Sequence, residues 1–206
     1  MKAPKKYLFY ALFLKILDKI FALYDNYFMD CGKLRKDIIS RREGLSEREV
    51  LDCSKPVFDA LFAMPEVNSA EVFFVYKSFR GEIDTNKIIA TLKNMGKTVL
   101  VPLIANGEML AVLPEGDNFV LDGFGVEIPE KYSLGIKPDV TVTPLVACDE
   151  NKNRVGFGKG FYDRFFSKND CLKIGVCYDF QVVNSISPKP WDIPLDVIIT
   201  EKRVIL

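Results

Sequence analysis

A buried strand, a helix and a second buried strand follow one another in the chain, and this order constrains the fold more than any other feature. Val72–Tyr76 is a run of β-branched and aromatic residues, which is typical of a buried strand. Asp84 or Thr85 can cap the next segment as a helix, which we expect to end at Met95. A second strand is expected at Thr98–Pro102. Because such a unit joins parallel strands, the sequence predicts a mainly parallel sheet with helices on its faces.

Helices are expected before this unit and further strands after it. Ser46 and Glu49 have the spacing of a capping box, which predicts a helix that ends near Ala63. A basic helix is expected before it, from Asp30 to about Arg42. Short strands and loops are expected from Ala105 to Lys137, and three more strands follow: Val140–Pro144, Lys173–Tyr178 and Val197–Thr200. The 206 residues are enough for one domain, so we expect a single three-layer α/β domain.

The charge balance and the lack of histidine exclude several classes of function. Lys plus Arg and Asp plus Glu both number 28, so no net field attracts nucleic acid, and we expect no nucleic-acid partner. Without histidine, Ser-His-Asp hydrolysis, Cys-His hydrolysis and histidine-ligated metals are excluded. Any metal must be a hard cation held by carboxylates and phosphates, which favours magnesium. Phosphoryl transfer fits this composition, because it depends mainly on positioning and charge stabilisation.

The cysteines indicate a reducing compartment. They are odd in number and form no Cys-x-x-Cys pair, which is typical of reduced thiols rather than of a disulfide framework or a zinc site. We therefore expect a cytoplasmic protein. The residues concerned are Cys31, Cys53, Cys148, Cys171 and Cys177.

A glycine-rich segment, Asn153–Phe166, carries the clearest functional signal. Its glycines occupy alternate positions: Gly156, Gly158 and Gly160. Alternate glycines allow positive φ angles and leave no Cβ atoms in the way of a bound group. Lys159 lies between two of them, and the next residues have helical spacing, so backbone N–H groups and a helix N-terminus would face the same concavity. The pattern predicts a phosphate-binding loop, with Asp163 placed where it could hold a metal ion.

Two well-known phosphate motifs do not fit this loop. A Walker A loop requires Ser or Thr after the lysine, but Gly160 follows Lys159. A dinucleotide-binding fingerprint that starts at Gly156 requires glycine at its sixth position, where Phe161 stands. A plain turn before a helix is the alternative interpretation of the glycines.

The flanking residues favour a specific phosphate-binding loop. Arg154, the three glycines, Lys159 and Tyr162–Arg164 together closely resemble the signature of the 5-formyltetrahydrofolate cyclo-ligase (methenyltetrahydrofolate synthetase) family. The resemblance extends in order from about Lys33 to Glu201. The other matching segments are Lys33–Arg35, Arg41–Arg42, Leu45–Ser46, Glu82–Thr85, Pro144–Asp149, Gln181, Asp192–Asp196 and Ile199–Glu201. It implies a fold akin to the sugar-phosphate isomerase and CoA-transferase group, and an enzyme that cyclises 5-formyltetrahydrofolate with ATP and Mg²⁺.

The resemblance also implies an ATP site. Its residues would be Lys33, Arg35, Arg154, Gly156, Phe157, Gly158, Lys159, Gly160, Phe161 and Tyr162. Of these, Lys159 and Arg154 would stabilise charge on the transferring phosphoryl group, and Asp163 and Asp192 would bind magnesium. Three of these four residues have a plainer interpretation: Lys159 as a solvated lysine, Asp163 as a complement to the helix dipole, and Asp192 as a turn residue.

The implied folate site contains four residues: Lys77, Glu82, Phe157 and Phe161. Glu82 would accept paired N–H bonds from the aminopyrimidine edge of the pterin ring. Lys77 stands where the family tends to be apolar, so its backbone is the expected contact. Core packing explains the two phenylalanines nearly as well as stacking does. The expected partners are ATP and a reduced folate, bound by a monomer.

Two departures from the family pattern support an alternative function. Cys31 stands one helical turn before Arg35, where the family usually has a lysine, and Lys33 lies on a different face of that helix. Ile128 precedes Pro129 where the family usually has Glu-Pro, so Glu127 is shifted by one position. The alternative is a nucleotide- or folate-binding protein that has lost turnover. A sugar-phosphate isomerase or an acyl-CoA transferase is a third hypothesis, based on fold analogy alone.

Residues 1–28 differ from the rest of the chain. They are very apolar, but charges gather on one helical face, and Lys15 interrupts the apolar run after Leu14, which argues against a spanning helix. Three interpretations stay open: an upstream extension or misassigned start before Met29, an amphipathic helix that packs on the domain or on a membrane, and a targeting segment. We expect an amphipathic extension over 1–28, with membrane contact not favoured, and a cyclo-ligase domain over 29–206.

Overall fold

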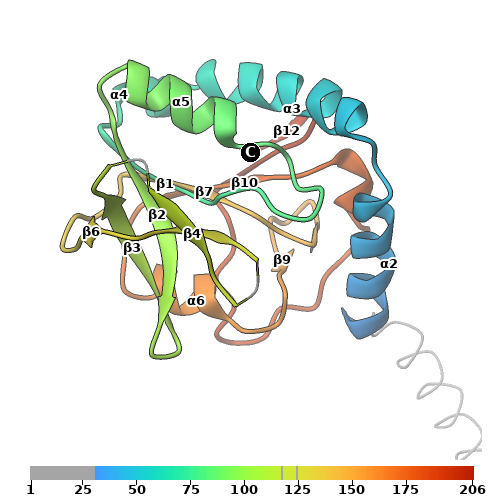
Figure 1. Ribbon diagram of the computed structural model, residues 1–206. Helices are drawn as coiled ribbons and strands as arrows, with labels where there is room; N and C mark the ends of the chain where they lie inside the picture. Colours follow the sequence, from blue (N-terminus) through green and yellow to red (C-terminus); the bar gives the residue numbers. More distant parts are fainter. Residues whose placement is uncertain (1–30, 117, 124) are drawn as a thin grey trace, which may run out of the picture. The chain divides into compact units, whose positions relative to one another are not determined.

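Eight strands form one sheet, and the strand–helix–strand unit expected from the sequence lies at its centre (Figure 1). The computed structural model describes residues 31–116, 118–123 and 125–206, and the extension expected over residues 1–28 lies outside the described residues. In sheet order the strands are β12 (Val204–Ile205), β11 (Val197–Ile199), β10 (Leu172–Val176), β7 (Val140–Thr143), β1 (Val72–Val75), β2 (Thr98–Ala105), β3 (Glu108–Pro114) and β6 (Tyr132–Ser133).

The centre of this sheet is parallel, as expected. Strands β11, β10, β7, β1 and β2 run in one direction, whereas β12, β3 and β6 are antiparallel to their neighbours. In the central unit Val72 pairs with Thr98 and Phe73 pairs with Val99. The helices are α2 (Cys31–Glu43), α3 (Glu47–Phe62), α4 (Pro65–Ser69), α5 (Asn86–Asn94), α6 (Phe161–Phe166) and the 3₁₀ helix η1 (Asp179–Gln181).

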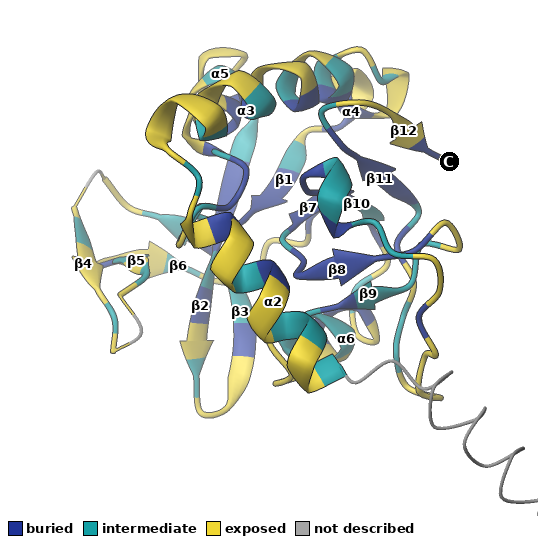
Figure 2. Ribbon diagram, turned by 90° about the vertical axis from the view of Figure 1, so that its right-hand side faces the viewer, coloured by how far each residue is buried: buried dark blue, intermediate teal, exposed yellow. Residues whose placement is uncertain are grey.

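Helices cover both faces of the sheet, which confirms the three-layer prediction. Helices α3 and α5 lie on one face and α6 lies on the other (Figure 1). Successive strand residues point to opposite faces, so Phe73 joins a core with Ile88 of α5, whereas Phe74 packs against Phe165 of α6. The central strands are buried along their length, while the outer faces of α2, α3 and α5 are exposed (Figure 2).

The capping expected at two helix starts is confirmed by side-chain hydrogen bonds at α3 but not for Thr85 at α5. The Ser46 hydroxyl accepts a hydrogen bond from the Glu49 amide at 3.3 Å, and the Glu49 carboxylate accepts one from the Ser46 amide at 2.8 Å. The predicted capping box is therefore confirmed. Thr85 is the N-cap residue of α5, but its hydroxyl donates to the Tyr76 carbonyl oxygen at 2.7 Å instead of capping the helix.

Strand β2 is longer than the sequence analysis predicted. It continues to Ala105 because Asn106 and Gly107, with φ angles of 52° and 77°, form a two-residue turn into β3. An Asn-Gly pair between apolar runs is a strong hairpin signal, and the expectation of short strands and loops after Ala105 missed it.

The sheet order creates a position for a ligand beside β1. From β1 the chain continues through α5 to β2 on one side, while β7 lies on the other side. Ligands of open α/β sheets bind beyond the carboxyl ends of strands at such a switch point. The 76–85 loop follows β1 there. After β7 comes a small hairpin that carries the glycine loop, built from β8 (Ala147–Cys148) and β9 (Arg154–Val155). No helix within the described residues is long and apolar enough to cross a membrane.

Candidate functional site

The glycine loop connects β9 to α6 and has the backbone that the sequence predicted at two of its three glycines. Gly158 and Gly160 have φ angles of 91° and 64°, and Gly160 is the N-cap residue of α6. Gly156 does not have a positive φ angle. Helix α6 has only six residues, so its dipole is small. An anion would be attracted mainly by the backbone amides near its start that have no partner within the helix.

Helix α2 contributes an arginine to this loop. Arg35 Nε donates a hydrogen bond to the Gly156 carbonyl oxygen at 2.7 Å, although the two residues are 121 positions apart. A Cβ atom added to Gly158 would lie 3.6 Å from the Arg35 guanidinium carbon. The structure thus brings together two predicted ATP-binding elements, the basic helix and the glycine loop. Lys33 and Cys31 lie on the same helix.

Phe157, Gly158 and Lys159 are the exposed residues of the loop, and two of them, Lys159 and Phe157, carry side chains that could contact a ligand. The Lys159 side chain is exposed, while its carbonyl oxygen accepts a hydrogen bond from Arg164 Nη1 at 2.8 Å. Phe157 is 50% exposed, so its ring has room for a stacking partner. Phe161 differs: it packs against the core below α6 and lines a separate cavity of about 350 Å³ with Met109. The two phenylalanines that the sequence assigned to the folate therefore have different surroundings.

Arg154 and Asp163 form an ion pair that joins the loop to the closing segment of the chain. Arg154 Nη2 lies 2.7 Å from Asp163 Oδ1, and the Arg154 side chain is only 6% exposed. Arg154 Nη1 donates to the Ile193 carbonyl oxygen, and the Ile193 amide donates to Asp163 Oδ1 at 3.1 Å. Burial lowers the pKa of Arg154, while Asp163 and the nearby Asp192 oppose this shift. The predicted residues Arg154, Asp163 and Asp192 thus lie in one neighbourhood.

The two expected metal ligands each keep one carboxylate oxygen available. Both side-chain contacts of Asp163 use Oδ1, and Asp192 accepts a hydrogen bond from the Lys189 amide through Oδ2 at 2.8 Å. Among the described residues, Asp163 Oδ2 and Asp192 Oδ1 make no hydrogen bond or ion pair. That part of the chain also contains no group of three or more Cys, Asp or Glu residues that could hold a metal ion.

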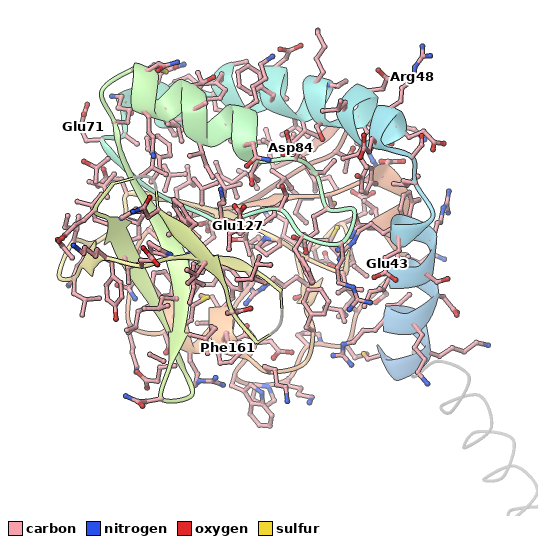
Figure 3. The ribbon with its side chains drawn as sticks, viewed as in Figure 1. Glu43, Arg48, Glu71, Asp84, Glu127 and Phe161 are labelled. Carbon is pink, nitrogen blue, oxygen red and sulfur yellow. The ribbon has the colours of Figure 1, made fainter. Side chains whose placement is uncertain are left out.

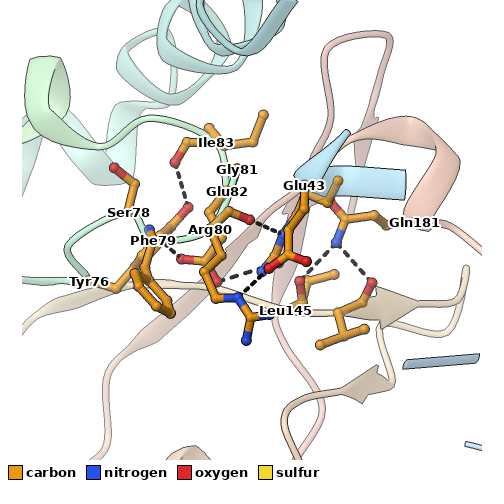
Figure 4. Close-up of polar contacts among 12 residues, drawn as sticks. Glu43, Tyr76, Ser78, Phe79, Arg80, Gly81, Glu82, Ile83, Leu145 and Gln181 are labelled. Carbon is orange, nitrogen blue, oxygen red and sulfur yellow. Dashed lines mark hydrogen bonds and ion pairs between the residues drawn. The ribbon is translucent and has the colours of Figure 1, made fainter. Parts of the chain in front are cut away.

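Glu82 is buried in the loop that follows β1. It is 7% exposed and forms an ion pair with Arg42 of α2, with 3.4 Å between Oε1 and Nη1. Its Oε2 atom accepts a hydrogen bond from the Phe79 amide at 3.1 Å (Figure 4). Burial raises the pKa of Glu82 to about 7, against the opposing effects of Arg42 and the Phe79 amide. The Arg42 guanidinium also lies 5.8 Å from the centre of the Phe157 ring, so Arg42 links two predicted folate-binding residues.

Lys77 has different neighbours from Glu82. Its Nζ atom lies 2.9 Å from Glu127 and 4.9 Å from the centre of the Phe119 ring. These partners belong to a small hairpin of β4 (Phe119–Leu121) and β5 (Glu127–Pro129), where Figure 3 shows Glu127. Together with Lys93 they line a cavity of about 420 Å³. The shifted Glu127 thus serves as the ion-pair partner of Lys77.

Tyr162 lies inside the aromatic packing below the loop. Its ring centre is 6.3 Å from that of Phe74 and 5.8 Å from that of Phe166. Burial raises the pKa of Tyr162, with a further contribution from Glu82, so the hydroxyl stays protonated at neutral pH. We infer that the predicted contact of Tyr162 with ATP would be made by its backbone.

Sequence reasoning did not single out Arg42. It placed Arg42 on a basic helix and in a segment, Arg41–Arg42, that resembles the family, but gave no sign that the side chain is buried against Glu82. The available signal was weak: Arg42 is four residues after Ile38, one turn along α2, and both residues are buried. Nothing in the sequence indicates which loop that helix covers.

Comparison with known proteins gives a consistent result. Residues 30–201 match the model of the 5-formyltetrahydrofolate cyclo-ligase family. The 5-formyltetrahydrofolate cyclo-ligase of Escherichia coli strain K12 is 31% identical over 179 residues, which cover 81% of this chain and 98% of that protein. The solution structure of Aquifex aeolicus 5,10-methenyltetrahydrofolate synthetase aligns with a TM-score of 0.77 at 31% identity, covering 85% of this chain and 92% of that one. The corresponding synthetase of Mycoplasma pneumoniae aligns with a TM-score of 0.67 at 25% identity, covering 84% and 99%.

Proposed function

The chain belongs to the 5-formyltetrahydrofolate cyclo-ligase family, and we propose that it converts 5-formyltetrahydrofolate to 5,10-methenyltetrahydrofolate with ATP, releasing ADP and phosphate. The observation that carries this proposal is the meeting of four segments at one switch point of the sheet: α2, the glycine loop, the closing segment and the loop that follows β1. Arg35 from α2 contacts the glycine loop, and Arg154 ties that loop to the closing segment. The buried carboxylate of Glu82 lies in the loop that follows β1.

The reaction couples a phosphoryl transfer to a ring closure. The formyl oxygen attacks the γ-phosphorus of ATP, the bond between that phosphorus and the bridging oxygen breaks, and ADP leaves. The neighbouring folate nitrogen then attacks the activated formyl carbon and gives up its proton to the solvent, and the carbon–oxygen bond breaks to release phosphate. In our proposal, Arg35 and the amides of the glycine loop bind the phosphates. Lys159, Arg154 and these amides stabilise the charge on the transferring phosphoryl group.

Magnesium fits the residues present. Asp163 and Asp192 each have a carboxylate oxygen without a partner among the described residues, and two carboxylates plus phosphate oxygens and water are a usual ligand set for Mg²⁺. When bound, the ion would neutralise charge on the phosphates. Arg154 would hold Asp163 in position through Oδ1.

The folate would lie between Glu82 and the glycine loop. As a carboxylate, Glu82 can accept two parallel N–H bonds from the aminopyrimidine edge of the pterin. Phe157 offers its exposed ring as a stacking surface close to Arg42. Lys77 pairs with Glu127 at 2.9 Å, so we propose that its contact with the folate is made by its backbone.

The test of the function is ADP release by the full chain with ATP, Mg²⁺ and 5-formyltetrahydrofolate. We expect ADP and methenyltetrahydrofolate in equal amounts, and no ADP above background without the folate. Binding of both ligands by calorimetry without product would favour the non-catalytic alternative, which Cys31 motivates because it stands where the family has a lysine. Turnover of a sugar phosphate or an acyl-CoA without ATP would instead support the third hypothesis.

A shortened chain that begins at Met29 should fold and turn over substrate much like the full chain. It keeps all of α2, whose Arg35 and Arg42 contact the loops of the site. It should also be more soluble, because it lacks an apolar and aromatic segment. Thermal unfolding, kinetics and vesicle sedimentation of both chains test this. A collapse of the melting transition would show that the first 28 residues pack on the domain, and loss of vesicle binding alone would show a membrane anchor.

We propose that the protein acts as a cytoplasmic monomer.

A further inference from the structure

Arg42 and Glu82 form a buried pair between α2 and the loop that follows β1. Arg42 is 1% exposed and Glu82 is 7% exposed. Arg42 Nε donates to the Arg80 carbonyl oxygen at 3.0 Å, but its Nη1 and Nη2 atoms are buried without a hydrogen-bond partner among the described residues. The ion-pair separation of 3.4 Å is long for a charged hydrogen bond.

The loop that follows β1 packs closely against the backbone of Arg42. Gly81 has a φ angle of 68°, and a Cβ atom there would lie 2.5 Å from the Arg42 carbonyl oxygen. Glu43 beside Arg42 pairs with Arg80 of the same loop, and Tyr178 donates to the Gly81 carbonyl oxygen at 3.0 Å. The contact between helix and loop is therefore close, and the position of Glu82 depends on it.

The Arg42–Glu82 pair is not expected to increase the free energy of unfolding. Removing two charges from water is costly, and buried guanidinium N–H groups without acceptors add to that cost. Buried polar groups without partners are rare in native proteins, and each one calls for an explanation. A role in ligand binding explains why the pair is buried. The free-energy cost of burying it then serves a function and not the stability of the fold.

Arg42 is the only cation among the described groups that act on Glu82. The other titratable groups facing it are the hydroxyls of Tyr76 on β1, Tyr162 on α6 and Tyr178 after β10. Burial raises the pKa of each of these tyrosines, so none of them carries charge at neutral pH. Burial thus favours the protonated form of Glu82, whereas Arg42 and the Phe79 amide favour the ionised form.

We propose that Arg42 is a positioning residue for the folate: it holds Glu82 as an oriented carboxylate, ready to accept the paired N–H groups of an aminopyrimidine ring. The proposal rests on the proposed function, in which Glu82 binds the pterin. A protonated Glu82 would present an O–H donor to N–H donors and lose one of the two hydrogen bonds. Without Arg42, burial would dominate and the neutral form would prevail at neutral pH.

The proposal predicts how folate affinity depends on pH. Burial raises the pKa of Glu82 in the free protein to about 7. In this proposal only the ionised form makes both hydrogen bonds to the folate. The dissociation constant for folate should therefore fall as pH rises through about 7 and then level off. Replacing Arg42 by an uncharged residue raises the pKa of Glu82 further, so the midpoint of this profile should move to higher pH. At neutral pH the affinity should drop on the order of tenfold.

The experiment measures 5-formyltetrahydrofolate and ATP binding by calorimetry from roughly pH 6 to 9 in the full chain, a range that brackets a carboxyl group with a raised pKa. The variants are Arg42→Met, Arg42→Lys and the matched control Arg41→Met, which removes a neighbouring exposed charge that lies over Phe180. Arg42→Met should move the midpoint of the folate-binding profile to higher pH. Arg42→Lys and Arg41→Met should keep the wild-type midpoint. ATP affinity should stay within about twofold in all three, because Arg42 does not face the phosphates in this proposal. If Arg42→Met does not fold, Arg42→Gln replaces it, since it keeps a donor but no charge.

Three results would overturn this inference. The first is a wild-type folate profile in the uncharged variant, and the second is an equal loss of ATP and folate affinity, which would indicate a merely structural role. The third is a shift of the midpoint to higher pH in Arg42→Lys as large as that in Arg42→Met, because the charge would then not be the cause. Failure of the proposed function is distinguishable: a protein that does not use the folate would not bind it at any pH in the wild-type chain, and a non-catalytic binding protein would bind it but release no ADP with ATP and Mg²⁺.

Discussion

Replacing Lys159 with alanine should lower kcat/KM for ATP by about two orders of magnitude and leave the fold intact. Lys159 is exposed in the glycine loop, between the two residues with positive φ angles. A point charge placed on a transferring phosphoryl group stabilises the transition state more than the bound substrate, so most of the loss should appear in kcat. An exposed side chain contributes little packing, so the free energy of unfolding should change by less than about 0.5 kcal/mol. Steady-state kinetics and urea unfolding of the variant measure both quantities.

Lys168→Ala provides the matched control for Lys159→Ala. Lys168 lies just after α6 and forms a surface ion pair with Glu108 at 2.7 Å. Exposed pairs of this kind contribute little, so both the kinetics and the unfolding of this variant should stay close to wild type. Unchanged kinetics in Lys159→Ala itself would show that Lys159 is only a solvated loop residue and would remove it from the proposed ATP site.

Replacing Asp163 with asparagine should have two separable effects. The Mg²⁺ concentration for half-maximal activity should rise about tenfold or more, because a neutral amide is a much weaker ligand for a hard cation. The fold should also lose about 2 kcal/mol, because the buried Arg154 loses the anionic end of a charged hydrogen bond. A magnesium titration of activity and urea unfolding of the variant separate the two.

Asp192→Asn helps to assign these effects. The one described side-chain contact of Asp192 is with the Lys189 amide, which an asparagine oxygen can also accept. This variant should therefore share the change in the magnesium titration but lose less stability than Asp163→Asn. Asp170→Asn, at an exposed position shortly after α6, should show neither effect. An unaltered magnesium titration in Asp163→Asn would reassign that residue to holding Arg154 and the start of α6.

The local parts of this structure could be predicted from the sequence because short-range rules specify them. The run at Val72–Tyr76 predicted the central strand, and Ser46 with Glu49 predicted the start of α3. The glycines at 158 and 160 predicted a loop with positive φ angles, which only glycine adopts at little cost. The turn at Asn106 and Gly107 obeys a rule of the same kind, so it could have been predicted as well.

The tertiary structure alone decided which side chains meet at the candidate site. The hydrogen bond from Arg35 to Gly156 spans 121 positions, and the pairing of Arg42 with Glu82 depends on how α2 packs across the loop after β1. The sequence predicted both basic residues on one helix, but a helix pattern does not show which loop the helix covers. Phe157 and Phe161 illustrate the same limit, since two similar residues four positions apart differ in exposure and neighbours.

The physical reason for this division is the range of the interactions. Capping, strand periodicity and glycine conformation depend on residues within a few positions of each other, so the sequence by itself determined the elements and the glycine loop of this protein. The charge and orientation of Glu82 depend on burial and on a guanidinium group from another element. Such properties exist only once the sheet and its helices have packed, and for that reason only the tertiary structure could decide them.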